Sequence, residues 1–139
     1  MSIVTDCSMA LSWYLPDEAG TASAPVLDSV VEAGGAVPVV FKIEFANALT
    51  VAVRRGRIGL DFRTKAFVEF SRLDMEQDLG GLENCWSDTI ELADRHRLSA
   101  YDASYLELAI RRRFPLATLD TRLADAARKE GVAIMGPLS

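Results

Sequence analysis

The sequence predicts an α/β fold in which a short, mainly parallel β-sheet carries helices on its faces. Short apolar runs rich in β-branched residues are bounded by turn residues, and the segments between them have apolar residues at helical spacing. Strands that alternate with helices form parallel sheets covered on both faces. With 139 residues, half of them hydrophobic, and no repeat or linker, we expect one domain over residues 1–139.

The chain begins with a β-prone run at 3–5, which we expect to be the first strand, and a helical pattern follows at 8–14. Residues 15–18, Leu-Pro-Asp-Glu, are typical of a turn and a new helix start. That second helix should either run through Pro25 or begin again there, because proline suits the first turn of a helix but not its interior.

Gly34 and Gly35 should end the second helix, since glycine is the commonest residue after a helix C-terminus. Residues 36–40 are then expected to form a strand, with Pro38 at its end or on a sheet edge. Residues 41–55 have the apolar period of a helix.

The glycines at 56 and 59 separate that helix from another at 60–72. A short strand is expected at 73–76, followed by a loop at 78–81. Residues 82–97 are predicted to form one amphipathic helix, with a buried stripe made of Leu82, Trp86, Ile90 and Ala93.

The last part of the chain repeats the alternation of helix and strand. We expect a helix at 99–112 with Ser99 as its N-cap, and a strand at 115–118. A helix at 121–129, closed by Gly131, should precede the final strand at 132–135.

The net charge of −5 argues against nucleic-acid binding by bulk electrostatics, although it allows a local basic strip. Arginines cluster at 54–57 and at 111–113, each after an expected helix. Such clusters either complement a helix C-terminus in solvent or contact phosphates. No apolar run is long enough to span a membrane and the N-terminus does not resemble a signal peptide, so we expect a cytoplasmic protein.

Several residues that often carry chemistry are predicted to play ordinary roles. Cys7 and Cys85 lack metal-type spacing and should be reduced thiols. His96 lies in a basic segment and is expected to be exposed. Trp13, Trp86 and the phenylalanines are interpreted as core or dimer contacts.

Four carboxylates are candidates for one site. Asp6 and Asp120 follow expected strands, at the sheet edge where α/β proteins bind ligands. Asp102 and Glu44 lie on or beside the apolar faces of two expected helices. Each has an alternative role: Asp6 and Asp120 suit helix N-caps, Asp102 suits a capping box with Ser99, and Glu44 suits a helix surface.

Four acids in one crevice would raise one another's pKa unless a cation shared the site. Oxygen ligands without histidine or thiolate point to Mg²⁺ or Mn²⁺ and to phosphodiester hydrolysis. The hydroxyls of Ser8 and Thr118, two residues from Asp6 and Asp120, are candidates for orienting those ligands. Both hydroxyls are also common in plain caps and strands.

The same residues carry a resemblance to a known family. Ile-Val-Thr-Asp-Cys-Ser at 3–8 is followed by Phe-Lys-Ile-Glu-Phe-Ala-Asn-Ala-Leu at 41–49. Ala-Tyr-Asp-Ala-Ser-Tyr-Leu-Glu-Leu-Ala at 100–109 and Leu-Ala-Thr-Leu-Asp-Thr-Arg-Leu at 116–123 complete the set. In this order and spacing, the motifs resemble those of PIN-domain ribonucleases, specifically the VapC-type toxins of bacterial type II toxin–antitoxin pairs.

The resemblance implies the three-layer PIN-like fold, Mg²⁺- or Mn²⁺-dependent RNA endonuclease activity, a homodimer and a cognate antitoxin. It places the family's metal-binding acids on Asp6, Glu44, Asp102 and Asp120 and the supporting hydroxyl on Ser8. Cys7 departs from the small residue expected after the first aspartate. Substrate choice would depend on loops and a basic rim, for which the candidates are Arg54, Arg55 and Arg57.

Two other functions compete with the ribonuclease. A haloacid-dehalogenase-like phosphatase would use Asp6 as its nucleophile, but this chemistry needs an aspartate two residues later, where the chain has Ser8. A catalytically silent PIN module would only hold a partner, and the presence of all four acids counts against that loss of function.

Overall fold

The computed structural model describes residues 2–15 and 22–139. Its five strands form one all-parallel sheet in the order β3-β2-β1-β4-β5. The strands are β1 (Ile3–Thr5), β2 (Gly35–Pro38), β3 (Met75–Asp78), β4 (Leu116–Ala117) and β5 (Ile134–Met135). The described helices are α1 (Cys7–Tyr14), α2 (Ala24–Ala33), α3 (Phe41–Arg54), α4 (Leu60–Ser71), the 3₁₀-helix η1 (Gly80–Asn84), α5 (Asp88–His96), α6 (Ala100–Arg112) and α7 (Thr121–Lys129).

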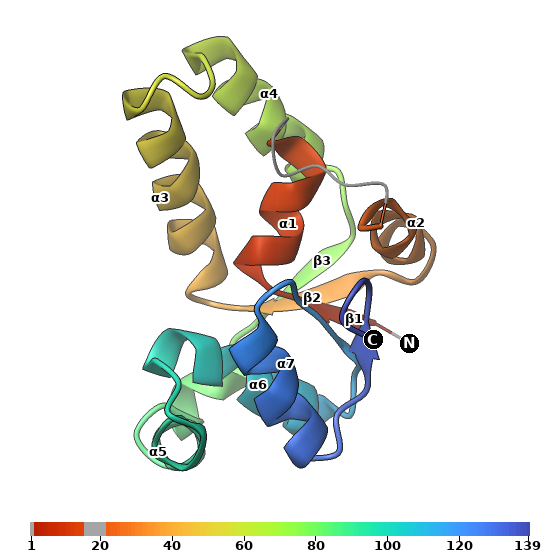
Figure 1. Ribbon diagram of the computed structural model, residues 1–139, viewed down its shortest axis with the longest axis vertical. Coiled ribbons are helices and arrows are strands. Elements are labelled where there is room, and N and C mark those ends of the chain that lie inside the picture. The colour runs from red at the N-terminus through yellow and green to blue at the C-terminus, as the bar shows by residue number, and fades with distance from the viewer. Residues whose placement is uncertain (1, 16–21) are drawn as a thin grey trace.

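The helices form a layer on each side of the sheet. Figure 1 shows α1, α2, α3 and α4 on one side of the strands and α5, α6 and α7 on the other. This arrangement confirms the predicted three-layer α/β fold. No helix in the described ranges is long and apolar enough to cross a membrane.

The central strand β1 is buried along its whole length because both of its neighbours are strands and both of its faces carry helices. Val4 pairs with Ala36 of β2 on one side and with Leu116 of β4 on the other. A strand in this position must be apolar throughout, which explains why its sequence does not alternate.

The topology brings particular chain segments to the carboxyl edge of the sheet. β1 and β4 both end there, and α3 begins there because only two residues separate it from β2. A helix that connects parallel strands runs antiparallel to them. The N-termini of α6 and α7, which lie on either side of β4 in the sequence, therefore also lie at this edge.

Most expected elements are present, with shifted ends. The helix α2 begins at Ala24 with Pro25 in its first turn, and Gly34 ends it with a φ of 81° that favours glycine. The turn expected at 15–18 falls mainly on residues outside those described. The strand β2 starts one residue early, ends at Pro38 and is internal, so proline marks a strand end and not an edge. β3 lies two residues later than predicted.

The prediction of a single helix at 82–97 is wrong. The chain forms η1, turns at Ser87, whose φ of −126° and ψ of −95° are not helical, and restarts as α5. Trp86 is 96% exposed and Leu82 55% exposed, whereas Thr89 and Leu92 are buried with Ala93. Because one helical period was extended across the break, Leu82, Trp86 and Ile90 of the predicted stripe are exposed, and only its Ala93 is buried. The exposed Trp86 cannot be a core residue, so only a dimer contact is left of its predicted roles.

His96 was predicted to be exposed, but only 7% of its side chain is accessible to solvent. Its Nε2 atom lies 2.6 Å from Oε2 of Glu130, next to the end of α7. The partner is 34 residues away in the sequence, so local composition did not reveal it. Among the described residues, Cys7 and Cys85 form no disulfide.

Candidate active site

Asp6 links the end of β1 to the start of α1. Its Oδ1 atom accepts hydrogen bonds from the backbone N–H of Met9 (2.9 Å) and the hydroxyl of Ser8 (2.7 Å), and its Oδ2 atom accepts one from Thr118. These bonds favour the carboxylate, but the side chain is only 4% exposed. Burial outweighs them and raises the pKa of Asp6 from 3.8 to about 6.

Ser8 and Thr118 fasten the ends of β1 and β4 to each other. The Ser8 hydroxyl accepts a hydrogen bond from the backbone N–H of Leu119 (3.0 Å), and that of Thr118 accepts one from the backbone N–H of Asp120 (3.0 Å). The two hydroxyl oxygens lie 3.5 Å apart. Both side chains thus fix the orientation of Asp6 relative to β4.

Glu44 lies in the first turn of α3 and is half-buried. Its Oε1 atom accepts a 2.7 Å hydrogen bond from the hydroxyl of Tyr105, a residue of α6 that is 1% exposed. Burial is the main cause that raises the pKa of Glu44, and the charge of Asp102 adds to it. The buried Tyr105 therefore holds one carboxylate oxygen of Glu44 in place.

Asp102 and Asp120 each belong to a helix N-terminus. The Ser99 hydroxyl accepts a hydrogen bond from the backbone N–H of Asp102 (3.0 Å), so this end of α6 is capped as predicted. Oδ1 of Asp120 accepts hydrogen bonds from the backbone N–H groups of Arg122 (2.9 Å) and Leu123 (3.3 Å). Capping of α7 leaves the Oδ2 atom of Asp120 outside these bonds.

The four carboxylates form one electrostatically coupled cluster at the carboxyl edge of the sheet. The charge of Asp102 raises the pKa of both Asp6 and Glu44. Burial raises the pKa of Asp102 itself, and the charge of Asp120 raises it further. Asp102 is therefore close enough to repel Asp6, Glu44 and Asp120, and it links the four carboxylates.

The chemistry of this cluster fits a hard divalent cation. Its donors are carboxylate oxygens, and a cation would relieve the repulsion between Asp102 and the other three carboxylates. Within residues 2–15 and 22–139, no three His, Cys, Asp or Glu side chains are drawn together into a ready group of metal ligands. The carboxylates thus form an open cluster whose side chains would have to close around an ion.

Two residues of this region were not assigned a role from the sequence. Tyr105 lies one helical turn after Asp102 on the same face, and this spacing is a signal that could have linked it to the site. Arg122 lies two residues after Asp120, and its charge opposes the rise in the pKa of Asp102. No pattern in the sequence indicated that interaction.

The two arginine clusters lie away from the four carboxylates. Arg54 is at the C-terminal end of α3, ten residues from Glu44, which corresponds to about 15 Å along the helix (Figure 1). Arg111 of the second cluster binds the carboxylates of Asp78 and Glu107, both buried. Arg111 therefore ties β3 to α6.

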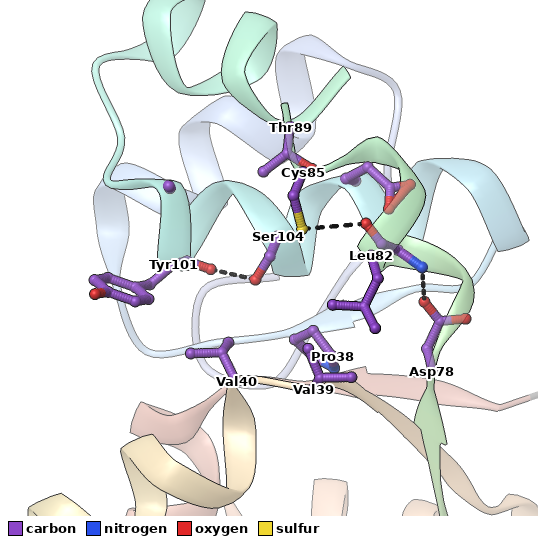
Figure 2. Close-up of a pocket in the computed structure, with 12 residues that line it drawn as sticks. Pro38, Val39, Val40, Asp78, Leu82, Cys85, Thr89, Tyr101 and Ser104 are labelled. Carbon is purple, nitrogen blue, oxygen red and sulfur yellow. Dashed lines mark hydrogen bonds between the residues drawn. The ribbon is translucent and has the colours of Figure 1, made fainter. Parts of the chain in front are cut away.

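A hollow of about 200 Å³ lies between the end of β2, η1 and α6. In Figure 2, Val40, Leu82 and Tyr101 line it, and its polar groups bond to one another. The Ser104 hydroxyl donates to the backbone oxygen of Tyr101 (2.5 Å), and the Cys85 thiol donates to that of Gly81 (3.4 Å). Because its acidic residues are paired with Arg111, this hollow is not a second catalytic cluster.

The fold and the acidic edge together define a class of protein. A family model described as PIN domain matches residues 3–129, so the chain belongs to the PIN-domain family, whose members are generally metal-dependent nucleases.

Solved structures agree with this assignment. PAE2754 from Pyrobaculum aerophilum is 20% identical, with a TM-score of 0.69 over 96% of this chain and 89% of that chain. FitAcB from Neisseria gonorrhoeae is 15% identical, with a TM-score of 0.66 over 97% of both chains. At these identities, the likeness shows a shared fold. No curated protein sequence matches this chain.

Proposed function

We propose that this protein is a metal-dependent endoribonuclease that hydrolyses RNA phosphodiester bonds at the four-carboxylate edge. The observation that supports this proposal is the gathering of Asp6, Glu44, Asp102 and Asp120 at one edge of a PIN fold, where burial raises the pKa values of Asp6, Glu44 and Asp102 and a neighbouring carboxylate raises each of them further. Such excess negative charge is what a Mg²⁺ or Mn²⁺ ion would neutralise.

Each side chain has a distinct part in this proposal. Asp6 and Asp102 would be the principal metal ligands, while Glu44 and Asp120 would complete the acidic site and position water. When bound, the ion would make hydroxide available near neutral pH and offset the charge that develops on the scissile phosphate.

The surrounding hydrogen bonds keep these ligands oriented. Ser8 and Thr118 donate to the two oxygens of Asp6, and Tyr105 donates to Glu44. Holding a ligand's rotamer before the ion arrives reduces the entropy lost on binding. These three hydroxyls are therefore assigned to orientation and not to proton transfer.

We further propose that the chain is the toxin of a bacterial toxin–antitoxin pair, acting in the cytoplasm as a homodimer that a cognate antitoxin blocks. This part of the proposal rests on the resemblance of the motifs at 3–8, 41–49, 100–109 and 116–123 to VapC-type toxins. The phosphatase alternative loses its basis, since the chain is a PIN domain and Ser8 is bonded to Asp6 where that chemistry needs an acid.

RNA cleavage in the presence of Mg²⁺ or Mn²⁺ tests the proposal, with any bound partner first removed. Wild type should cut a broad pool of cellular RNAs, and EDTA should stop it. Asp6→Asn and Asp102→Asn should each lower the rate by at least a hundredfold in folded protein, because each removes a ligand charge. Asp28→Asn, an exposed site on α2, makes the same chemical change away from the edge and should retain activity.

Cleavage that persists in EDTA or in both site variants would contradict the metal-dependent mechanism. If wild type binds the ion but cuts no RNA in the pool, the partner-holding PIN module becomes the better description.

A further inference from the structure

A hollow of about 350 Å³ with a basic lining lies between the end of α5 and one face of α7. Its charged lining residues are Arg95, His96, Arg97, Arg122, Asp125 and Lys129. Five of these six side chains carry or can carry positive charge, although the whole chain has a net charge of −5. We call this surface the basic hollow.

Three of these six residues, Arg95, His96 and Asp125, are already in ion pairs. Arg95 and His96 both bond to Oε2 of Glu130. Asp125, the acidic member of the lining, bonds to Arg128 at 3.0 Å, so its charge is already paired.

Arg97, Arg122 and Lys129 are left without an ion pair within the described ranges. The guanidinium of Arg122 donates to the backbone oxygen of Arg97 (2.8 Å), and this bond connects the start of α7 to the end of α5. That bond uses one N–H group and leaves the charge of Arg122 available. Three cations therefore face the hollow with unused hydrogen-bond donors.

These cations form a short track that leads to the acidic edge. Arg122 and Lys129 are seven residues apart on α7, which places them on one helix face about 10 Å from each other. Arg122 also lies two residues after Asp120 and donates its backbone N–H to the Oδ1 atom of that carboxylate (2.9 Å). One end of the basic hollow thus borders the proposed catalytic edge.

We propose that Arg97, Arg122 and Lys129 bind the phosphate backbone of RNA and guide it to the carboxylate edge. An acidic chain repels a polyanion, so substrate binding requires unpaired cations close to the site. The arginines at 54 and 55 are about 15 Å from Glu44, and α3 has no cation between them and that carboxylate. Arg122, in contrast, lies two residues from Asp120 and brings the track to the edge. This inference rests on the proposed ribonuclease function and assigns its substrate-binding surface.

Equilibrium binding of a fluorescently labelled single-stranded RNA, measured over a range of salt concentrations in EDTA, tests the inference without cleavage. The test protein is Arg97→Asn with Lys129→Gln. Asparagine suits position 97, where φ is 55°, because it tolerates the left-handed conformation, and both side chains are exposed. Each lost phosphate contact should flatten the log–log salt slope by about 0.7, hence about 1.4 for the pair.

Affinity at low salt should fall on the order of tenfold in this variant. Arg113→Asn with Lys65→Gln is a matched control: Arg113 also ends a helix with a left-handed φ of 56°, but it lies at the far end of α6 from Asp102. The control should keep the wild-type slope. Arg54→Ala with Arg55→Ala should flatten the slope less than the basic-hollow variant does.

The inference is overturned if wild type shows no salt-dependent RNA binding, or if the basic-hollow variant keeps the wild-type slope. A labelled polyglutamate that binds the same residues more tightly than RNA would instead assign the hollow to an acidic protein partner. Because binding is read in EDTA, a failure of cleavage does not mimic any of these results.

Discussion

At the scale of single residues, Asp6 shows how burial and hydrogen bonding compete at one carboxylate. Three donors stabilise its charge, yet removal from water dominates and raises its pKa to about 6. Without a bound cation, an ionised Asp6 therefore destabilises the folded protein. A bound cation would offset this destabilisation, so the same carboxylate lowers the stability of the metal-free protein and favours ion binding.

This competition predicts a pH-dependent stability difference. Between about pH 4 and pH 6, unfolded Asp6 has lost its proton while the folded residue retains it, so stability falls as pH rises through this window. Above pH 6 the full cost applies, about 3 kcal/mol for a pKa raised from 3.8 to about 6. Asp6→Asn keeps an N-cap without the charge and should be more stable than wild type at pH 8 in EDTA, by up to that amount.

Urea denaturation of both proteins in EDTA at pH 4 and pH 8 measures this difference. The advantage of Asp6→Asn should shrink at pH 4, where folded Asp6 is protonated and the unfolded residue is only partly ionised. A variant less stable than wild type at pH 8 would show that the hydrogen bonds of Asp6 outweigh its burial.

Tyr105 gives a second prediction at this scale. Tyr105→Phe keeps the buried ring but removes the hydroxyl that holds Glu44. Calorimetric titration should show Mg²⁺ or Mn²⁺ binding weakened by about tenfold or more, as for other partners of metal ligands. Stability in EDTA should fall by only about 1 kcal/mol, the contribution of one hydrogen bond.

Tyr101→Phe is the matched control for Tyr105→Phe, since Tyr101 lies on the same helix and is exposed. It should leave ion binding unchanged. Equal ion affinity in wild type and Tyr105→Phe would show that Glu44 needs no support from this hydroxyl.

At the scale of elements, α5 is the clearest case of a face that the sequence misplaced. The helix buries Thr89, Leu92 and Ala93 against its neighbours, whereas Trp86 lies before it in the turn after η1. The break at Ser87 resets the helical phase. Only residues after the break share a common buried face.

Paired substitutions test this face. Leu92→Ala should lower the free energy of unfolding by about 2 kcal/mol or more, because it leaves a cavity under α5. Trp86→Gln should change it by less than about 0.5 kcal/mol, since the indole is exposed. Chemical denaturation at low protein concentration gives both values, and the reverse order would restore the predicted stripe.

At the scale of the whole molecule, the parallel sheet organises the charges. At its carboxyl edge, four helices (α1, α3, α6 and α7) begin near the ends of β1 and β4. These segments supply the four acids and the supporting hydroxyls of Ser8 and Thr118. The layer formed by α5, α6 and α7 adds the basic hollow next to these acids. A net charge of −5 thus combines an acidic edge with a neighbouring cationic track.

Much of this architecture could be predicted from local sequence patterns. Asp6 and Asp120 could be placed at one edge because strand ends in a parallel sheet converge there, and Ser99 could be identified as a cap from its position before an amphipathic helix. Strand limits were less predictable. β2 and β3 each shifted by one or two residues because their pairing, and not their composition, sets their register.

The sequence by itself determined the α/β class, the alternation of strands and helices, and the set of acids that could share one edge. These follow from side-chain periodicity and capping, which depend on neighbours within a few residues. Only the tertiary structure decided the bonds of Tyr105 to Glu44, of His96 to Glu130 and of Arg122 to Arg97, across 61, 34 and 25 residues. Such contacts depend on how helices pack across the sheet, and no local pattern encodes that packing.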